Sequence, residues 1–569
     1  MTKMTNKQKL ELTWIGKEKR PRLEPRIFLE DKELSCLGEQ KQGVFNDNLL
    51  IHSDNLLALK ALEQEYTGQV QCIYIDPPFN TGEAFENYDD GVEHSIWLSL
   101  MKQRLEILHS LLKKEGSLFV HIDDNELGYL LVLCDEIFGR ENRRSIISFK
   151  QSSVSGPKAQ NPGLVTTTNY IIWYAKDRKH WFSRKCYKET KRDSRYSKYI
   201  VNYDEHFNDW KLENVNTVFA QKHGVTSREL KKTFGDSLEK ELEAFVLQEP
   251  ERVVRTARVK EKDVNEAARE ALRLSSERDG VFRAEREGKS DYYFMNGEQL
   301  LFYSNKTKKI DGRNITGEAL SNSWDDLLSN NLHKEGGVTF PKGKKPEALI
   351  RRILELSSSE GDLILDSFAG SGSTAAVAHK MKRRWITIEL GEQAFTHVQP
   401  RMKRVILGTD KDGISKSVNW QGGGGFRYLR LAPSLLQKDE WGNWVINKEY
   451  NAEMLSAAMC KHMGFTYAPS ETQFWNHGYS TETDFIYVTT GALAYDQLKR
   501  ISEEVGEERT LLICCKAFMS EGADFANLTI KKIPQSILNK CEWDNDDYSF
   551  TLNVLAEDDV ELYDDEEDA

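Results

Sequence analysis

One short motif combines the residue types that can bind an amino group on a planar ring: Asp76-Pro77-Pro78-Phe79. The apolar run at residues 70–75 predicts a buried parallel strand just before it, and ligands bind at the carboxyl ends of such strands. Consecutive prolines fix φ and remove backbone donors, so the carboxylate of Asp76 and the nearby carbonyl oxygens form a rigid set of acceptors. The ring of Phe79 offers a face for stacking. The motif therefore indicates a site for an exocyclic amine, with a proline-rich turn as the alternative interpretation.

A glycine-rich loop that could bind a second ligand begins at Asp366. Phe368, Gly370 and Gly372 follow a predicted strand and precede a predicted helix at residues 374–381. Glycines let the backbone approach a ligand closely, and the amino end of a helix supplies free N–H groups. We therefore expect this loop to hold a cofactor.

An acidic residue, Glu389, closes the next predicted strand 17 positions after Gly372. A carboxylate in that place can bind the two hydroxyls of a ribose, which indicates a cofactor that contains adenosine. The spacing Gly370-x-Gly372-x-x-Ala375 also fits the dinucleotide fingerprint, so the loop alone does not separate NAD from another adenosine cofactor.

The elements that must position both motifs alternate between strands and helices on either side of a long insert. The apolar patterns predict strands at residues 70–75, 117–122, 170–174, 363–366 and 385–389, and helices at 97–114, 125–138, 346–356 and 374–381. Such alternation indicates an α/β fold with one parallel sheet assembled from two segments of the chain.

The charge is unevenly distributed along the chain. The net charge is -12, from 78 Lys and Arg against 90 Asp and Glu, and nine acidic residues at 557–569 carry about -9 of it. Residues 178–322 hold 30 Lys and Arg against 25 Asp and Glu, so the insert is locally basic. A solvated surface is the bland interpretation of such a region. Its densest part includes four candidate DNA contacts: Lys185, Lys188, Arg192 and Arg195.

The composition excludes several classes of protein. With 569 residues, 39% hydrophobic and 30% charged, the chain is neither a disordered tail protein nor collagen-like. No stretch approaches the roughly 20 apolar residues of a membrane helix, and the first thirty residues lack the apolar core of a signal peptide. The eight cysteines form no CxxC pattern, and no histidine has metal-ligand spacing. We expect a cytoplasmic protein without a metal site.

The two motifs together resemble those of the amino-methyltransferases that modify DNA bases with S-adenosylmethionine. The catalytic motif precedes the cofactor loop, as in the permuted β class of that family, and the basic insert then occupies the place of its target-recognition region. Lys342 and residues 346–350 resemble the helix that completes the methionine side of the cofactor pocket. The resemblance implies a circularly permuted, Rossmann-like methyltransferase with a mostly parallel seven-stranded sheet.

Further segments are similar to the modification (Mod) subunits of type III restriction-modification systems: residues 48–56, 119–126, 420–426 and 528–534. The resemblance spans about residues 45 to 540, with the insert matched by position and not by motif. It implies double-stranded DNA as the substrate, a homodimer, and a restriction (helicase-nuclease) subunit as a further partner. It also implies a smaller α+β module near the C-terminal end.

These features predict six segments. They are an N-terminal extension (1–44), the catalytic half of the methyltransferase domain (45–177), an inserted target-recognition domain (178–322), the cofactor-binding half (323–410), the C-terminal module (411–556) and an acidic tail (557–569).

The resemblance also implies roles for the motif residues, with adenine N6 as the methyl acceptor. Asp76 and the Pro77 carbonyl would accept the hydrogens of the amino group and localise its lone pair. Phe79 would stack on the base after the base has flipped out of the duplex. The glycine loop with Phe368 would hold the cofactor, and Glu389 its ribose.

Three alternatives stay open. Cytosine-N4 methylation also targets an exocyclic amine, although an Asp at position 76 favours adenine in this family. The chain could instead be mainly a specificity subunit that directs a helicase-nuclease partner on DNA. An NAD-dependent oxidoreductase would need neither the Pro-Pro-aromatic motif nor the basic insert.

Three other segments carry polar or reactive side chains that we expect to be structural. The run at residues 121–124 could suggest a metal or an acid-base pair, but strand-end and helix-capping roles are favoured. Residues 324–326 lie where the chain returns from the insert, which indicates a hinge. Cys514 and Cys515 follow apolar residues that predict a buried strand.

Overall fold

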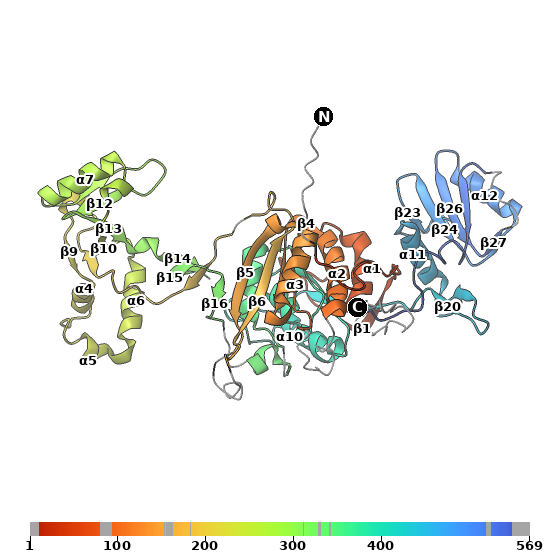
Figure 1. Ribbon diagram of the computed structural model, residues 1–569, viewed down its shortest axis with the longest axis horizontal. Coiled ribbons are helices and arrows are strands. Elements are labelled where there is room, and N and C mark those ends of the chain that lie inside the picture. The colour runs from red at the N-terminus through yellow and green to blue at the C-terminus, as the bar shows by residue number, and fades with distance from the viewer. Residues whose placement is uncertain are drawn as a thin grey trace, which may run out of the picture. The chain divides into compact units, whose positions relative to one another are not determined.

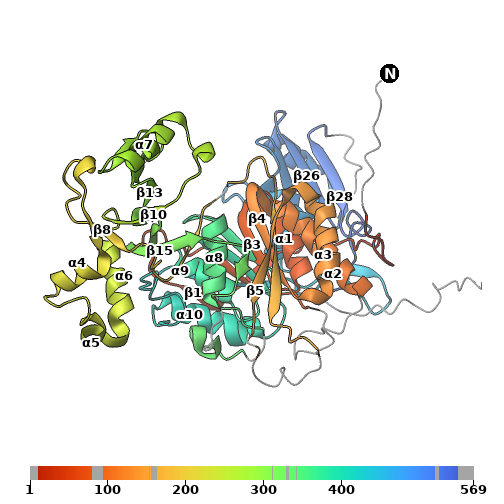
Figure 2. The same cartoon turned by 60° about the vertical axis from the view of Figure 1, so that its left-hand side comes forward.

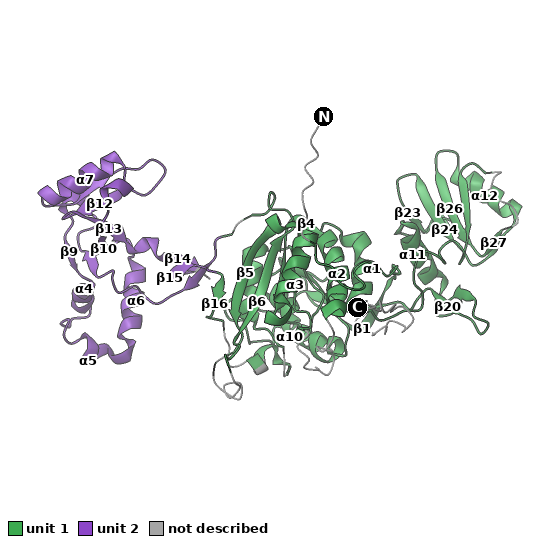
Figure 3. Cartoon of the chain, in the orientation of Figure 1, with its two compact units in different colours: residues 1–184, 322–569 green, residues 185–321 purple. Residues whose placement is uncertain are grey.

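The computed structural model divides the protein into two compact units (Figure 3). The first unit comprises residues 1–184 and 322–569, and the second comprises residues 185–321, which lie inside the predicted insert. The structure describes residues 11–79, 94–152, 154, 163–182, 184–310, 312–327, 332–340, 343–518 and 525–548. The candidate residue Lys342 and the predicted acidic tail lie outside the described residues.

The main sheet of the first unit is mixed and has ten strands within the described part of the chain. In spatial order these are β1 (Phe28–Leu37), β19 (Gly425–Leu431), β2 (Asn48–His52), β18 (Arg384–Glu389), β17 (Leu363–Asp366), β3 (Val70–Ile75), β4 (Leu112–Ile122), β6 (Thr168–Ala175), β5 (Arg143–Lys150) and β16 (Ser323–Trp324). The strands from β19 through β4 are all parallel, and β1 and β6 run antiparallel to their neighbours.

The predicted α/β class is confirmed, but the prediction of seven strands is wrong for this sheet. The seven strands from β2 to β5 are extended by β1 and β19 at one edge and by β16 at the other. Strand β19 comes from residues that we had assigned to the C-terminal module; its Phe426 and Tyr428 are fully buried, and its pairing with β2 removes an open sheet edge. Strand β5 was not predicted because only Ile147 and Phe149 within it are buried.

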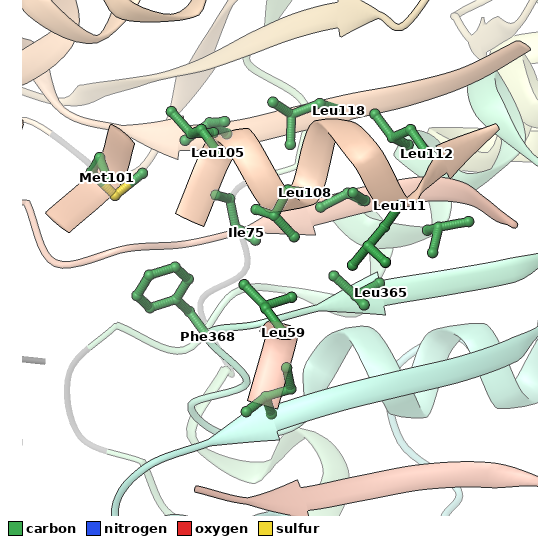
Figure 4. Packing of buried hydrophobic residues seen from close by; sticks show 14 of the residues in the cluster. Leu59, Ile75, Met101, Leu105, Leu108, Leu111, Leu112, Leu118, Leu365 and Phe368 are labelled. Atoms are coloured by element: carbon green, nitrogen blue, oxygen red, sulfur yellow. The ribbon is translucent and has the colours of Figure 1, made fainter. Parts of the chain in front are cut away.

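Helices cover both faces of this sheet (Figures 1 and 2). One face carries α1 (Asn55–Tyr66), α2 (His94–Leu111) and α3 (Asp124–Cys134), and the other carries α8 (Glu347–Ser357), α9 (Ser373–Lys380) and α10 (Gln399–Ile406). The apolar residues of α2 recur at helical spacing, so they form one buried stripe. Figure 4 shows its Leu105 and Leu108 packed with Ile75, Leu118 and Leu365 of the strands.

Two strands that are far apart in the sequence lie side by side at the centre of the sheet. Leu365 of β17 pairs with Ile73 of β3 in parallel. The chain continues from β17 to β18 on one side and from β3 to β4 on the other. The loops that leave β17 and β3 therefore diverge, and a crevice at such a switch point is where open α/β sheets bind ligands.

The second unit has its own core. A mixture of helices covers a sheet in the order β11-β12-β13-β10-β8-β9, and β14, β15 and β7 form a separate sheet. Leu230, Leu242, Phe245 and Val246 are buried in one of its cores. The bounds are β7 Tyr187–Glu189, β8 Lys198–Ile200, β9 Leu212–Asn214, α4 Val215–Lys222, α5 Leu230–Phe234, α6 Leu238–Gln248, β10 Val253–Ala257, α7 Glu266–Glu277, β11 Phe282–Ala284, β12 Tyr292–Met295, β13 Glu298–Phe302, β14 Thr307–Ile310 and β15 Arg313–Ala319.

The C-terminal part of the first unit forms a smaller sheet in the order β22-β23-β24-β26-β28. Helices α11 and α12 pack against it through two separate cores, and the predicted strand with buried Cys514 and Cys515 is confirmed as β26. The bounds are β20 Leu436–Lys438, β21 Trp444–Ile446, α11 Ala452–Met463, β22 Thr466–Tyr467, β23 Gly478–Tyr479, β24 Asp484–Val488, β25 Ala492–Leu493, α12 Tyr495–Val505, β26 Thr510–Cys515, β27 Ala517–Phe518 and β28 Leu528–Lys532. No described helix of the protein is long and apolar enough to cross a membrane.

A buried ionic network joins the helices on one face of the main sheet. Glu347, the first residue of α8, accepts hydrogen bonds from Lys380 at 2.7 Å and from Arg401 at 2.8 Å. Lys380 also lies 2.9 Å from Asp410, and all four side chains are fully buried. Buried charges are tolerated only when they are paired, so the ends of α8, α9 and α10 are held at fixed positions.

We expect Glu347→Ala to lower the free energy of unfolding by about 3–5 kcal/mol, because Lys380 and Arg401 would lose a shared buried partner. Urea denaturation followed by fluorescence measures the change. Glu33→Ala, which removes an exposed carboxylate from β1 of the same sheet, should stay within about 0.5 kcal/mol. A loss similar to that of this control would contradict the role of the network.

Candidate active site

Asp76 is the first residue after β3, and its carboxylate is bound to one cation. Its Oδ2 lies 2.5 Å from Nζ of Lys345, whose side chain is only 6% exposed. Burial raises the pKa of Asp76, and the positive charge of Lys345 opposes that rise. The other oxygen, Oδ1, is buried and has no hydrogen-bond partner among the described residues. Asp76 therefore presents one vacant, charged acceptor.

The two prolines and the aromatic residue of the motif pack against Trp97 and His121. Pro77 and Pro78 are buried, and the indole Nε1 of Trp97 donates a 2.8 Å hydrogen bond to the carbonyl oxygen of Pro78. The ring of Phe79 stacks on His121, with centroids 5.9 Å apart and an interplanar angle of 20°. Nζ of Lys345 lies 5.2 Å from the centroid of the same ring. Residues 77–79 are thus packed against neighbouring side chains and form a surface that we call the platform, and the Asp76 carboxylate directly precedes them in the chain.

His121 has a supporting position under this platform. It is fully buried, 3.0 Å from the Tyr74 hydroxyl and 3.2 Å from Nδ2 of Asn169. Burial lowers its pKa well below the usual range, so the ring is neutral. Asp123 caps α3 by accepting the N–H of Asn125 at 3.0 Å, which confirms the expected capping role. No cluster of metal-ligating side chains occurs in the described ranges.

Residues 324–326, where the sequence predicts a hinge, make packing and ionic contacts in the first unit. Trp324 is buried in β16, with the guanidinium of Arg352 5.3 Å from its ring centroid. Arg352 also pairs with Asp326 at 2.7 Å.

The glycine loop leaves the neighbouring strand β17 at the same edge of the sheet. Asp366 is buried and its Oδ1 accepts the N–H of Phe368 at 3.0 Å, which turns the chain away from the strand. Gly370 and Gly372 have φ of 52° and 74°, a conformation that side chains disfavour. A Cβ at Gly372 would lie 3.0 Å from Val398, and a Cβ at Gly370 would lie 3.9 Å from the ring of Phe340, an ordinary van der Waals distance.

Glu389 connects this loop to the end of the next strand. Its Oε2 accepts the N–H of Gly370 at 2.7 Å, and its Oε1 accepts the N–H of Gly391 at 3.2 Å. The Glu389 carboxylate therefore fixes the glycine loop to the carboxyl end of β18.

Two residues, Phe368 and Lys345, differ in the structure from what we expected of the cofactor residues. The ring of Phe368 is 9% exposed and packs in the main core with Leu59, Ile75 and Met101 (Figure 4), so it supports the loop from below. Lys345 was missed by the sequence analysis, although it directly precedes the helix that we compared with a cofactor pocket. The only available signal was its position before Pro346 in that segment.

Lys345 is in turn held by the buried ionic network. Arg401 donates a 2.9 Å hydrogen bond to the hydroxyl of Ser373, the first residue of α9. That hydroxyl donates a 3.0 Å hydrogen bond to the carbonyl oxygen of Lys345. The ammonium beside Asp76 is therefore attached to the same framework that supports the glycine loop.

The carboxyl group of Asp366 has an unusually high pKa. Burial raises its pKa to about 7, and the negative charges of Asp76 and Glu389 add to that rise. Hydrogen bonds from Thr374 and from the backbone of Phe368 act in the opposite direction. The sheet edge therefore concentrates three carboxyl groups, and the observed cation beside them is Lys345.

The four candidate DNA contacts lie in the second unit. Lys185 is exposed, and Lys188 pairs with Glu318 at 3.2 Å. Two others are more constrained, because Arg192 is 8% exposed and pairs with Glu239 at 3.2 Å, and Arg195 pairs with Asp193 at 2.7 Å. Their contact with DNA stays a prediction.

Comparison with known proteins gives a family match and several relatives. Residues 70–400 match the DNA methylase family. The chain is 36% identical over 429 residues to the probable type III restriction-modification enzyme HindVI Mod subunit of Haemophilus influenzae, covering 70% of this chain and 56% of that protein. It is 24% identical to the type III restriction-modification enzyme EcoP15I Mod subunit of Escherichia coli, covering 76% and 73%, and 25% identical to the type II methyltransferase M.EcaI of Enterobacter cloacae, covering 70% and 80%.

We expect Asp366→Asn to stabilise the protein increasingly as the pH rises from 5 to 8. Between the ordinary pKa of 3.8 and the raised pKa of about 7, the folded state holds a proton that the unfolded chain has released, so the stability falls as the pH rises through this range and levels off above about 7. Asn does not ionise and avoids this loss. Thermal unfolding of both proteins across this pH range measures the difference, and Asp412→Asn, an exposed site, should show no such trend. A constant difference at all pH values would contradict the raised pKa.

Proposed function

Because the chain belongs to the DNA methylase family, we propose that it transfers a methyl group from S-adenosylmethionine to N6 of adenine in a specific DNA sequence. The observation that carries the proposal is the state of Asp76. One carboxylate oxygen is fixed by Lys345, and the other is a buried acceptor without a partner among the described residues. Asp76 follows β3 at a switch point of the sheet, and Nζ of Lys345, which binds its other oxygen, lies 5.2 Å from the centroid of the Phe79 ring.

The amino group of adenine is a poor nucleophile because its lone pair is delocalised into the ring. Oδ1 of Asp76 accepts one amino hydrogen and the carbonyl oxygen of Pro77 accepts the other, which localises the lone pair. The carbonyl oxygen of Pro78 accepts the indole N–H of Trp97, and this hydrogen bond fixes the turn. Alignment of the nucleophile with the methyl carbon supplies most of the remaining acceleration.

The target base must leave the duplex before it can reach this acceptor, at a cost of a few kcal/mol. The Phe79 ring offers a stacking face, which is worth about 1–3 kcal/mol in related single-strand contacts. His121 stacks on Phe79 and is buried in turn, so the platform is rigid before the base arrives.

The residues around the glycine loop fit an adenosine-containing cofactor. The positive φ of Gly370 and Gly372 gives a loop whose backbone can approach a ligand closely, and the Glu389 carboxylate contacts this loop at the end of β18, where a ribose would bind. When bound, S-adenosylmethionine supplies an electrophilic methyl group on a sulfonium. The amino group gives up a proton on methylation, and Asp76 is placed to receive it because burial raises the pKa of this carboxylate.

The order of the motifs supports a circularly permuted domain of the β class. The catalytic motif follows β3 and the cofactor loop follows β17, yet β3 and β17 are adjacent in the sheet. We assign residues 45–177 and 323–410 to the two halves of this domain, and residues 178–322 to target recognition. Cys72 of β3 pairs with Ile364 of β17, so the two halves form one continuous sheet.

We further propose that the protein is a modification subunit of a type III restriction-modification system. Its substrate would be double-stranded DNA in the cytoplasm, and it would act as a homodimer with a restriction subunit as partner. The relatives named above support this assignment, although the chain spans 56% of the length of the Haemophilus influenzae protein.

Long-read methylome sequencing of cells with and without the gene tests the proposal. We expect N6-methyladenine at one short motif in the presence of the gene and its loss in the absence of the gene. Methylation at cytosine N4 would replace the adenine assignment. No difference in any modified base, with purified protein also inactive on that DNA, would overturn the proposed activity.

We expect Asp76→Ala to abolish methyl transfer while leaving DNA affinity within about twofold, because the acceptor contacts the amino group only during alignment. Tritiated methyl transfer and a gel-shift assay measure the two quantities. Asp124→Ala is the matched control, since Asp124 is an exposed acid just beyond the neighbouring strand β4 and should be nearly neutral. Retained methylation in Asp76→Ala would refute the assigned role.

A second prediction concerns the cation beside Asp76. Lys345→Met should raise the pKa of Asp76 further, since burial would then act without an opposing charge. The acidic limb of the pH profile for single-turnover methyl transfer should move to higher pH, so the loss of rate is larger at pH 6 than at pH 8. Lys345→Arg keeps the charge and should leave this limb nearer to that of the original protein. A uniform loss at every pH would indicate that Lys345 only supports the fold.

A further inference from the structure

The charges of the second unit are segregated along its sequence. Residues 185–321 contain 27 Lys and Arg against 25 Asp and Glu, a net charge of only +2. Two short segments, 185–192 and 306–319, together contain eight basic residues against three acidic residues, a net charge of +5. The rest of the unit therefore carries -3. The net positive charge of the unit therefore comes from these two segments.

The fold brings the two segments together. They form the sheet of β7, β14 and β15, which we call the basic sheet. Lys188 of β7 is the partner of Glu318 of β15 across the sheet, although 130 positions separate them in the sequence. On the other side of β15, Lys309 pairs with Asn314. Basic residues from both segments therefore lie on neighbouring strands.

One end of the basic sheet is anchored in the core of the unit. Ile315, Thr316 and Gly317 of β15 are buried. The hydroxyl of Thr316 lies 2.7 Å from the Tyr303 hydroxyl and donates a 3.0 Å hydrogen bond to Glu243. Lys309 of β14 and Arg313 and Asn314 of β15 are exposed.

Several cations of the basic sheet and of the residues flanking it have no acidic partner among the described residues. Lys185, Lys191, Lys309 and Arg313 are exposed, and none of the four forms an ion pair with a described residue. Lys188 is different, because Glu318 neutralises it at 3.2 Å. A region that collects unneutralised cations while the remainder of its unit is acidic is the electrostatic footprint of a contact with phosphates.

We propose that the basic sheet contacts duplex DNA, with the β14–β15 hairpin lying along a groove and its exposed cations on the phosphates. This inference rests on the proposed function, which makes DNA the substrate. A two-stranded ribbon fits the major groove, which is about 12 Å wide. The proposal adds Lys309 and Arg313 to the DNA contacts that the sequence predicts. It makes Arg192 a less favoured contact, because the side chain of Arg192 is only 8% exposed.

Salt-dependent DNA binding by the full-length protein tests this surface. Lys309→Ala/Arg313→Ala removes two phosphate contacts, so the slope of log affinity against log salt concentration should become shallower by about 1.8. We expect the affinity to fall about tenfold near 0.1 M salt. Lys185→Ala/Lys191→Ala, on the other segment of the same surface, should act in the same direction.

The matched control is Lys260→Ala/Lys262→Ala, which also removes two exposed cations from the second unit but lies outside the basic sheet. Its slope and affinity should equal those of the original protein. Equal melting temperatures for all three variants would show that each is folded.

The outcomes separate this inference from the proposed function. If both variants of the surface bind as the control does, the basic sheet is not a DNA contact, while methylation by the original protein still upholds the proposed function. If all three variants lose affinity equally, the effect is one of net charge and the inference is also overturned. If the original protein methylates no DNA, the proposed function fails whatever the binding data show.

Discussion

An ionised carboxylate that is largely removed from water raises the free energy of a protein unless a cation or hydrogen bonds compensate for it. Asp76 is in this situation at the edge of the main sheet, close to two further carboxyl groups whose charges act on one another. Lys345 supplies the compensation through one oxygen only. The remaining oxygen has no hydrogen-bond partner among the described residues. The proposed chemistry depends on this half-satisfied carboxylate, because an acceptor that was fully bonded could not engage an amino group.

The rest of the first unit is arranged so that this ion pair can form. Lys345 belongs to a segment that is remote from Asp76 in the sequence, and its backbone is held through Ser373 by Arg401. Arg401 in turn is neutralised by Glu347 in a fully buried network. The same network fixes the start of α9, where the glycine loop ends. The acceptor and the cofactor loop are therefore positioned by one set of buried charges, and their separation is set by the pairing of β3 with β17.

In the second unit, the charged residues that matter for the proposals lie on the surface and not in the core. Its core is apolar and independent, and its basic residues gather on one small sheet. In the proposed function, the parallel sheet of the first unit aligns the reacting groups, and the separately folded second unit recognises DNA. Long-range attraction and register depend on the surface charge of the second unit, whereas the reaction depends on the buried charge of the first.

The sequence by itself determined the strands β3, β17 and β18, the helices α2 and α9 that follow β3 and β17, and the two motifs at the carboxyl ends of these two strands. These features depend on local patterns: apolar runs, helical spacing, prolines and glycines that restrict or free the backbone. It also indicated the separate insert through a shift in charge. Only the tertiary structure decided that Lys345 meets Asp76, that Phe368 packs in the core, and that β1, β19 and β16 extend the sheet. Only the tertiary structure, likewise, brought Lys309 and Arg313 into the same small sheet as Lys188. Such contacts join residues that are distant along the chain, and a local pattern contains no information about which distant residue will supply the partner.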